Sequence, residues 1–249
     1  NGDNYRGTVV VRDGRIDKVD TRSLAKARGA DGGRIGQAMA AYAAWHPSGE
    51  FAAYSANDIF QFFHAVGDVR DVFDSESDLA LYHVDSNRVS TSPKISRPDR
   101  LETFPAWSPD GRVLYFCAVD PLTRPQYTQV SYDLMRIAYD PCSGEWGELE
   151  TVLRSKDTGL SITEPRVSPD GKWLLFCMSD YGSFPVYRPS SDLYLLNLET
   201  QEHHRLAVNS PRSESWHCWS SNSRWIAFAS KRLDGVFGRD DPPAQHRQI

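Results

Sequence analysis

The sequence lacks the motifs that most directly identify a catalytic or metal-binding protein. Its 4 cysteines form no Cys-x-x-Cys pair, so neither a zinc knuckle nor covalent haem attachment is indicated. It contains no Gly-x-Ser-x-Gly stretch, so the nucleophile of an α/β-hydrolase would have to lie outside this chain. No apolar run approaches the roughly 20 residues that a membrane-spanning helix needs. The first residue is not Met, which favours a fragment of a longer protein. No secretory signal is visible, but a missing N-terminus would remove one, so its absence proves nothing.

An excess of positive charge is missing as well. The 249 residues carry a net charge of −5, and the isoelectric point is near 5.8. Because nucleic-acid binding usually needs a basic stripe, we expect no nucleic-acid partner. Aromatic residues make up 12% of the chain and charged residues 24%, so there is enough apolar material for a folded core. A chain of this length is compatible with one all-β domain.

What the sequence does contain is a repeat. Four times an aromatic or branched residue is followed by a tight polar turn and a short apolar run. The four turns are 45–49 (Trp-His-Pro-Ser-Gly), 107–111 (Trp-Ser-Pro-Asp-Gly), 167–171 (Val-Ser-Pro-Asp-Gly) and 219–223 (Trp-Ser-Ser-Asn-Ser). Their first residues are 62, 60 and 52 positions apart. This spacing is near the length of a four-stranded propeller blade with long loops.

Each turn is predicted to close a hairpin between two strands. Proline fixes φ at the start of the turn, and glycine accepts a positive φ at its end. The fourth copy has neither residue, and Asn222 is predicted to take the left-handed position. Second strands are predicted at 50–55, 112–117, 172–177 and 224–229, and later strands at 78–82, 133–137 and 192–196 and near Val89, Leu149 and His204.

These patterns predict an all-β fold, a β-propeller of four-stranded antiparallel blades in meander order. Three blades are complete, at 41–93, 101–157 and 161–208, and half blades are predicted at 5–21 and 213–232. All belong to a single propeller domain at 1–235, or to part of one, and 236–249 forms an irregular tail. Either the halves pair to complete a four-bladed ring, or the chain is a fragment of a larger propeller.

The copies resemble the WD40-like (PD40) repeat of bacterial TolB-type propellers, whose units follow the pattern P-x-W-S-P-D-G-K-x-I-x-F and later D-I/L-Y. Residues 105–116 fit this pattern nearly throughout, 165–176 fit with Val167 in place of Trp, and 192–194 fit the later strand. The first copy departs at His46 and Ser48. The match covers about residues 41–230, and proteins of this appearance also occur in the Bacteroidetes group.

The resemblance implies a periplasmic or exported binding and scaffolding propeller, often within an envelope complex. We therefore expect a non-catalytic module that recognises a protein or peptide partner, with no cofactor and no catalytic residue in this chain. The alternative is a hydrolase that acts on peptides or glycans, or the accessory propeller of one, because the same repeat forms the propeller of prolyl-oligopeptidase-like enzymes. A superfold of this kind hosts many functions, so the fold alone does not decide between them.

The first candidate site lies on three long connections between second and third strands, at about 56–77, 118–132 and 178–191. Connections longer than folding requires usually serve a function. These contain aromatic and arginine side chains, the types that dominate binding surfaces. The candidate binding residues are Phe62, Phe63, His64, Tyr127, Tyr181, Phe184, Tyr187 and Arg188. Their side chains either form a partner surface or fold back as caps over the blade ends.

The second candidate site is the central channel, which the first strands are expected to line. The candidate channel residues are Glu102, Glu164, Arg166, Glu214 and His217. Carboxylates beside a histidine are able to form a metal or acid–base site, although channel side chains are often simply solvated or paired. Glu164 and Arg166 are two residues apart on a predicted strand, which would place them on one face as a surface pair.

The cysteines and the other histidines support no site. Cys117 and Cys177 occupy the same repeat position, where other copies have Ser55 and Ala229, so both are interpreted as small buried strand residues. His203 and His204 are adjacent in a predicted strand and should point to opposite faces, which disfavours chelation. No metal site is predicted.

Overall fold

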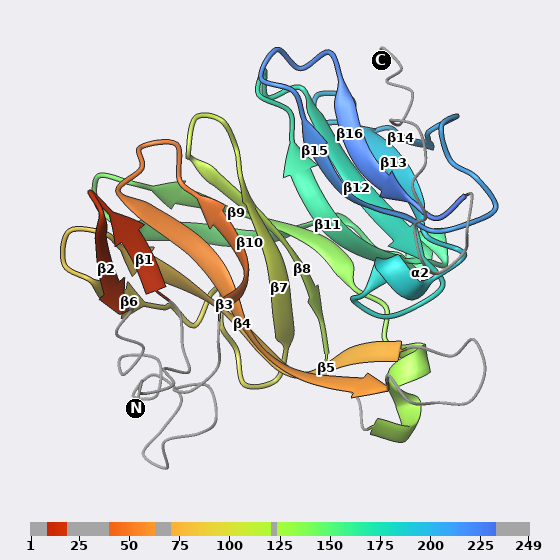
Figure 1. Cartoon of the computed structure of the whole chain (residues 1–249), viewed down its shortest axis with the longest axis horizontal. Coiled ribbons are helices and arrows are strands. Elements are labelled where there is room, and N and C mark those ends of the chain that lie inside the picture. The colour runs from red at the N-terminus through yellow and green to blue at the C-terminus, as the bar shows by residue number, and fades with distance from the viewer. Residues whose placement is uncertain (1–8, 19–39, 63–70, 121–123, 233–249) are drawn as a thin grey trace.

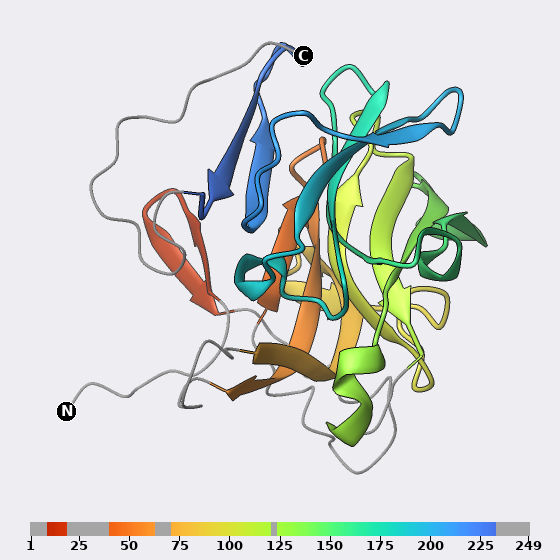
Figure 2. The same ribbon diagram turned by 90° about the vertical axis from the view of Figure 1, so that its right-hand side faces the viewer.

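The computed structural model describes residues 9–18, 40–62, 71–120 and 124–232. Within these ranges the chain is almost entirely β-structure (Figures 1 and 2). Three antiparallel four-stranded sheets follow one another along the chain, with one two-stranded sheet before them and another after them. Each four-stranded sheet keeps its strands in chain order, which is the meander of a propeller blade. The predicted all-β class and its four-stranded antiparallel blades are confirmed.

The strands fall into the expected groups. The first blade consists of β3 (Ala40–Trp45), β4 (Phe51–Phe62), β5 (Asp71–His83) and β6 (Arg88–Ser90). The second consists of β7 (Leu101–Trp107), β8 (Val113–Val119), β9 (Asp133–Asp140) and β10 (Glu145–Leu153). The third consists of β11 (Ser161–Val167), β12 (Trp173–Ser179), β13 (Asp192–Asn197) and β14 (His203–Arg205). The two-stranded sheets are β1 (Val9–Arg12) with β2 (Arg15–Lys18), and β15 (Glu214–Trp219) with β16 (Ile226–Ser230).

Helical structure is confined to short connections. The described residues contain the α-helix α2 (Ser155–Thr158) and the 3₁₀ segments η2 (Arg124–Gln129) and η3 (Pro185–Tyr187). No helix in these ranges is long and apolar enough to cross a membrane. The sheets β1–β2 and β15–β16 stay separate, so no strand ladder joins the two halves in the described part of the chain.

The first long connection differs from its prediction. The sequence predicts a loop at about 56–77, but β4 and β5 continue as a paired hairpin from Ala56↔Asp78 to Phe62↔Asp71. The polar residues of this segment gave it the appearance of a loop, yet Asp71 and Asp74 are buried and hydrogen-bonded. The resulting arm contacts β7 and extends past the second blade toward η2 (Figure 1). Its tip, at 63–70, lies outside the described residues.

The repeated turn is held by one hydrogen-bond pattern. In the second copy, Ser108 Oγ donates to Asp110 Oδ1 at 2.5 Å and accepts the N–H of Val113 at 2.9 Å. The third copy repeats these bonds with Ser168 and Asp170. In the first copy the His46 ring replaces the serine and contacts Ser48 Oγ at 2.9 Å.

The fourth turn corrects one prediction. Ser223, and not Asn222, has the left-handed backbone, with φ 59°. Asn222 instead takes the role of the aspartate, because its Oδ1 accepts hydrogen bonds from Ser220 Oγ at 2.7 Å and from the N–H of Arg224 at 3.1 Å. A side-chain oxygen at this position is therefore what the turn requires, and Asn supplies it as well as Asp does.

The blades pack face to face through shared apolar clusters. One cluster joins the first and second blades and includes Leu81 and Ile137. The next joins the second and third blades and includes Leu134 and Leu196. A third joins the third blade to β15–β16, and β1–β2 packs on the first blade through Val10. Each blade is covered on its faces by the blades next to it, and the burial of these apolar faces is the main contribution to the stability of the fold.

The first strands share an irregularity that shapes the interior. Phe104, Glu164 and Trp216 have a left-handed backbone, with φ 54°, 54° and 48°. Each lies where the register between first and second strand shifts by a β-bulge. A bulge interrupts the side-chain alternation of a strand. As a result Glu164 is buried while Arg166 is half-buried, and the predicted surface pair of these residues does not form.

The anchor tryptophans differ in burial for a topological reason. Trp107 packs on the preceding blade, with its ring centre 5.0 Å from that of His46 and 5.7 Å from that of Phe51. Trp219 likewise donates from Nε1 to the carbonyl of Arg166 at 3.0 Å. No first strand precedes β3 among the described residues, and Trp45 is 56% exposed. The repeat thus places these residues equivalently, and the neighbouring blade decides how far each is covered.

Candidate functional site

The first strands of the three blades end around a shared cleft on the side of the polar turns. Its volume is about 350 Å³. The walls come from the ends of β3, β7 and β11 and from the turns that follow them. The lining residues are Ala43, Ala44, Trp45, Pro47, Ala106, Trp107, Ser108, Pro109, Arg166, Val167 and Pro169. A concave, mostly apolar surface with few polar groups is the usual composition of a binding site.

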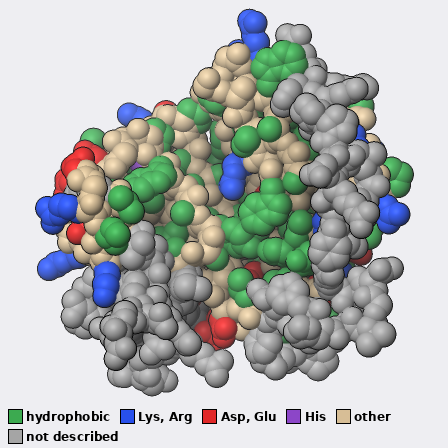
Figure 3. Space-filling model, in the orientation of Figure 1, with side chains coloured by type: hydrophobic (Ala, Val, Ile, Leu, Met, Phe, Trp, Pro, Cys, Tyr) green, Lys and Arg blue, Asp and Glu red, His purple; other side chains and the backbone are tan. Residues whose placement is uncertain are grey.

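Trp45 and Arg166 determine the chemistry of this cleft. Trp45 offers an exposed aromatic face on the wall. Arg166 donates from Nη1 to the carbonyl of Pro165 at 3.0 Å, and no carboxylate among the described residues forms an ion pair with it. On the face of the molecule shown in Figure 3, hydrophobic side chains gather over the middle, with a basic side chain among them. An arginine without an acidic partner is able to bind a carboxylate that a ligand brings.

Deeper in the interior the first strands meet through aromatic rings. The ring centre of Tyr42 lies 4.1 Å from that of Phe104 and 6.1 Å from that of Trp216. Burial raises the pKa of Tyr42, and the nearby carboxylates of Asp74 and Glu164 add to the shift. Tyr42, Phe104 and Trp216 occupy corresponding positions in β3, β7 and β15, so four first strands surround one axis. On β11 the corresponding residue is Glu164, which replaces the aromatic ring by a carboxylate.

On the opposite face, the connections between second and third strands pack on one another. Arg188, at the end of η3, forms a buried ion pair with Asp71 at the start of β5. The hydroxyl of Tyr181 donates to the second oxygen of Asp71 at 3.0 Å, and the guanidinium of Arg188 lies 3.4 Å from the centre of the Tyr181 ring. Burial is the largest cause of the rise in the Tyr181 pKa to about 12. The contact ties the first blade to the third.

The aromatic side chains of this face form two groups. Tyr127 stacks on Phe73 with ring centres 4.9 Å apart and meets the edge of Tyr181 at 6.3 Å. Phe184 contacts Tyr187 at 5.4 Å and Trp216 at 6.2 Å. Tyr127, Tyr181, Phe184 and Tyr187 are half-buried, whereas Arg188 is buried.

The predicted loop residues therefore converge only in part. Tyr181 and Arg188 meet through Asp71, and Phe184 meets Tyr187. The side chain of Phe62 lies outside the described residues, as do Phe63 and His64 altogether. For Arg188 the arrangement matches a cap over the blade ends, since its charge is already paired. The four aromatic residues keep part of their surface and stay candidates for binding.

The predicted channel residue Glu102 is held inside the protein by its own neighbours. Its side chain is fully buried and forms an ion pair with Arg100 Nε at 2.6 Å. It also accepts the N–H of Arg97 at 3.2 Å, which fixes the chain as it enters β7. Burial raises the pKa of Glu102 to about 8, although Arg100 acts in the opposite direction. This carboxylate anchors the blade and does not face the channel space.

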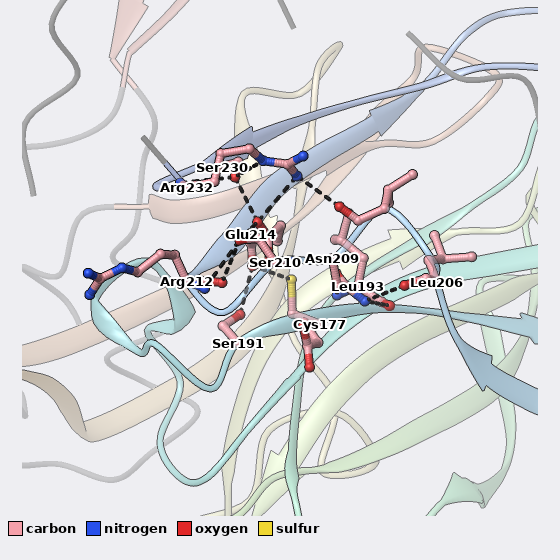
Figure 4. Close-up of polar contacts among 12 residues, drawn as sticks. Cys177, Ser191, Leu193, Leu206, Asn209, Ser210, Arg212, Glu214, Ser230 and Arg232 are labelled. Carbon is pink, nitrogen blue, oxygen red and sulfur yellow. Dashed lines mark hydrogen bonds and ion pairs between the residues drawn. The ribbon is translucent and has the colours of Figure 1, made fainter. Parts of the chain in front are cut away.

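Glu214 has the same role at the start of β15. It accepts hydrogen bonds from the N–H of Ser210 at 3.0 Å, from Ser210 Oγ at 2.6 Å and from Ser230 Oγ at 2.7 Å (Figure 4). Arg232 Nη2 lies 3.4 Å from the same carboxylate. Glu102 and Glu214 stand five residues before Trp107 and Trp219, so the repeat uses one device twice.

Three buried residues with metal-binding side chains meet between the third blade and β15. The Sγ of Cys177 lies 3.6 Å from Nδ1 of His217 and 3.7 Å from Oε2 of Glu164, and Nδ1 and Oε2 are 3.9 Å apart. Burial raises the pKa of Glu164 and that of Cys177. Burial, together with the charge of Arg166, lowers the pKa of His217 to about 3. Burial thus shifts each of the three groups toward its neutral form.

Sequence reasoning missed two buried carboxylates that connect the blades, Asp71 and Asp74. Asp71 and Asp74 were placed in a loop, and nothing in their local pattern marks them as partners of Arg188 and Tyr132. The meeting of Cys177 with Glu164 and His217 did leave a signal. Copies two and three have Pro105 and Pro165 where the fourth has His217, and a departure from a repeat indicates a separate role.

Comparisons with known proteins support the fold and leave the family open. No known family profile matches the sequence, and no curated protein matches it either. Among solved structures, the chain is similar to β-propellers, and the arrangement of its blades is of the TolB type. Against TolB from Acinetobacter baumannii, the identity is 16% and the TM-score 0.52, over 85% of this chain and 40% of that one. The chain thus spans 40% of the length of that protein.

Other structures are more distant. A TolB homologue from Agrobacterium tumefaciens, described as putative TolB, has 15% identity and a TM-score of 0.46, over 80% of this chain and 72% of its own. A structure from work on two prolyl endopeptidases has 16% identity and a TM-score of 0.47, over 80% of this chain and 25% of its own. At these identities the likeness shows the fold alone.

Proposed function

We propose that this chain is a non-catalytic binding propeller that holds an acidic peptide segment of a protein partner in the cleft at the ends of β3, β7 and β11. The observation that carries the proposal is Arg166, a cation without an acidic partner among the described residues, inside a cleft whose lining side chains are mostly apolar. A carboxylate of the partner would form the charge-assisted hydrogen bonds that Arg166 lacks. The exposed face of Trp45 would cover an apolar side chain beside it.

The loop face supports the proposal less well. Arg188, the buried arginine among the described residues of this face, is paired with Asp71 inside the protein, so it is not free to recognise a partner. Its aromatic residues are half-buried against one another. The cleft, in contrast, combines concavity, an exposed tryptophan and unpaired charge. For this reason the proposal places recognition at the cleft.

The test is selection of short random peptides from a displayed library, followed by calorimetric titration of the selected peptides. We expect acidic peptides, and we expect Arg166→Met to weaken them by about tenfold or more, because about 1.4 kcal/mol of interaction corresponds to a factor of ten. Trp45→Ala should weaken them as well. Arg136→Met, which removes an exposed arginine of β9, serves as the matched control and should leave affinity unchanged.

Tyr181→Ala separates the two faces. If it abolishes binding while Arg166→Met and Trp45→Ala do not, recognition occurs on the loop face and the proposal is wrong. Failure to select any peptide above background, with folded protein confirmed by circular dichroism, would also contradict it.

An exported location belongs to the same proposal and rests on the likeness to TolB-type propellers. Fractionation of cells that produce the native protein tests it. Recovery in the periplasmic or extracellular fraction is the expected result, and recovery in the cytoplasm would contradict it.

A further inference from the structure

We propose that Glu164, Cys177 and His217 form a binding site for one divalent transition-metal ion of the zinc class. The three residues come from β11, β12 and β15, and each offers one ligand atom to a common point. All three side chains are buried. Thiolate, imidazole and carboxylate are the ligand types that zinc prefers in proteins.

The distances fit a small tetrahedral ion. With bonds of about 2.3 Å to sulfur and about 2.0 Å to nitrogen and oxygen, tetrahedral angles require ligand separations of about 3.3–3.6 Å. The observed separations are 3.6 Å between Sγ and Nδ1, 3.7 Å between Sγ and Oε2, and 3.9 Å between Nδ1 and Oε2. A small approach of Glu164 toward His217 would bring the three separations to these values, and a water would fill the fourth tetrahedral position.

The histidine is already oriented as a ligand. Its Nε2–H donates to the carbonyl of Leu175 at 3.2 Å, so the lone pair is on Nδ1, the atom that faces Cys177 and Glu164. A hydrogen bond from the other ring nitrogen to a backbone carbonyl is the usual support of a metal-bound histidine. The same bond restricts rotation of the ring.

The carboxylate of Glu164 is able to accept more hydrogen bonds than it receives. Its Oε2 accepts the N–H of Trp216 at 2.8 Å, whereas Oε1 is buried without a hydrogen-bond partner among the described residues. A buried oxygen of this kind is costly unless something binds it. The ion would bind Oε2, the oxygen that faces Cys177 and His217, and a water on its fourth coordination position would be able to donate a hydrogen bond to Oε1.

The charges also balance. When the ion binds, the Cys177 thiol and the Glu164 carboxyl release the protons that they carry to water and bind as thiolate and carboxylate. One thiolate and one carboxylate then cancel the charge of a divalent cation, so the buried complex is neutral overall. A buried charge without such compensation would be strongly unfavourable.

The repeat supplies an internal comparison. At the interface between the second and third blades, the corresponding residues are Phe104, Cys117 and Pro165. Cys117 is as buried as Cys177 but has neither companion. Among the described residues, the metal set occurs where Glu replaces an aromatic residue and His replaces a proline. Its position lets the ion hold β15 on the third blade.

The test is calorimetric titration of Zn²⁺ into the metal-free chain and three variants. One equivalent should bind to the native chain and to Cys117→Ser, the matched control. Loss of supporting residues around a metal ligand costs about 10–100-fold in affinity, so Cys177→Ser and His217→Asn, which remove ligands, should lose more than about 100-fold. Zn²⁺ should raise the melting temperature of the native chain and of Cys117→Ser, but not of Cys177→Ser.

Co²⁺ provides a second measurement in the native chain, which is needed if a variant fails to fold. Binding through Cys177 gives a thiolate-to-cobalt charge-transfer absorption band, and this band should appear with one equivalent in the native chain and in Cys117→Ser. No band in the native chain, or Zn²⁺ affinity that persists in a folded Cys177→Ser variant, would overturn the proposal.

Discussion

Asp71 and Arg188 are 117 positions apart in the chain, and they form a buried ion pair that joins the first blade to the third. Asp71 stands at the start of β5, at the end of the arm, and Arg188 ends η3. The arm passes the second blade to make this contact (Figure 1). This ion pair therefore connects two blades that are not neighbours along the chain, independently of the packing between neighbouring blades.

The pair predicts an asymmetric response to mutation. Arg188→Met leaves the Asp71 charge buried and unpaired, so we expect the free energy of unfolding to fall by about 3 kcal/mol or more. In the double variant Asp71→Asn/Arg188→Met both charges are absent, and most of that loss should be recovered. Urea denaturation monitored by fluorescence measures both changes.

The exposed pair Arg136–Glu150 is the matched control for this experiment. Arg136→Met should cost less than about 1 kcal/mol, because water screens exposed ion pairs. Equal losses in Arg188→Met and Arg136→Met would show that the Asp71–Arg188 contact is not buried in solution.

The fold was accessible from the sequence because it is a repeat. Trp107, Val167 and Trp219 each begin a turn in which a serine hydroxyl accepts the N–H of the residue five positions after it. A turn held by hydrogen bonds between residues close in sequence leaves a short motif that can be recognised in the sequence. The arm was missed for the opposite reason, since its polar residues are satisfied by partners more than 40 positions away, such as Thr103 for Asn57.

The candidate site was harder to predict from the sequence, because an irregularity of the backbone determines where its side chains point. The sequence predicts a surface pair of Glu164 and Arg166 from simple alternation, but the bulge at Glu164 turns that side chain inward. Glu102 and Glu214 were likewise assigned to the channel, and the structure places both in contacts with their own strand entries. The burial of Glu164 depends on the β-bulge, and residue spacing reveals neither the bulge nor the burial.

The glycines of two equivalent turns should respond differently to substitution. Gly111 and Gly171 both have a left-handed backbone, with φ 71° and 72°. Alanine costs about 1 kcal/mol for this conformation at either position. At Gly111 a Cβ would also lie 2.1 Å from Nε2 of His46, whereas at Gly171 the nearest atom is 3.9 Å away. Gly111→Ala should therefore cost about 1–3 kcal/mol more than Gly171→Ala in urea denaturation.

The His46 ring cannot move away cheaply. It stacks on Phe51 at 4.1 Å, and its Nε2–H donates to the carbonyl of Gly111 at 3.1 Å across the interface of the first two blades. In a His46→Ala background the extra cost of Gly111→Ala should disappear. If the two glycine variants are equally stable in the native background, the close approach of these turns does not exist in solution.

Glu102 predicts a pH dependence of stability. Its pKa is about 8 in the folded chain, against an ordinary value of 4.5, because burial disfavours the carboxylate. Between these values the folded state binds more protons than the unfolded state. The contribution is fully present below pH 4.5 and is lost as the pH rises through 8, by at most about 1.4 kcal/mol per pH unit.

Glu102→Gln removes this titration, because a neutral amide takes the place of the carboxyl group at every pH. The difference in free energy of unfolding between the native chain and Glu102→Gln should therefore shift in favour of the variant from pH 5.5 to pH 8.5, an interval that covers about two and a half pH units of the window. Urea titrations at both pH values measure this. A difference that stays constant would mean that Glu102 is ionised throughout and that its pair with Arg100 outweighs burial.

The four cysteines should divide into two reactivity classes. Cys117 and Cys177 are buried, and burial raises the pKa of both thiols, so they are inaccessible and protonated in the folded chain. Cys142 and Cys218 are exposed. Because the thiolate is the reacting species, Ellman's reagent should modify only the two exposed thiols of the metal-free, folded chain at pH 8, and all four in denaturant.

Cys142→Ser and Cys218→Ser should each remove one fast-reacting thiol, whereas Cys117→Ser should change only the count in denaturant. Rapid modification of a third thiol under native conditions would mean that the interface between blades opens readily, since both buried thiols lie on the strands that form those interfaces.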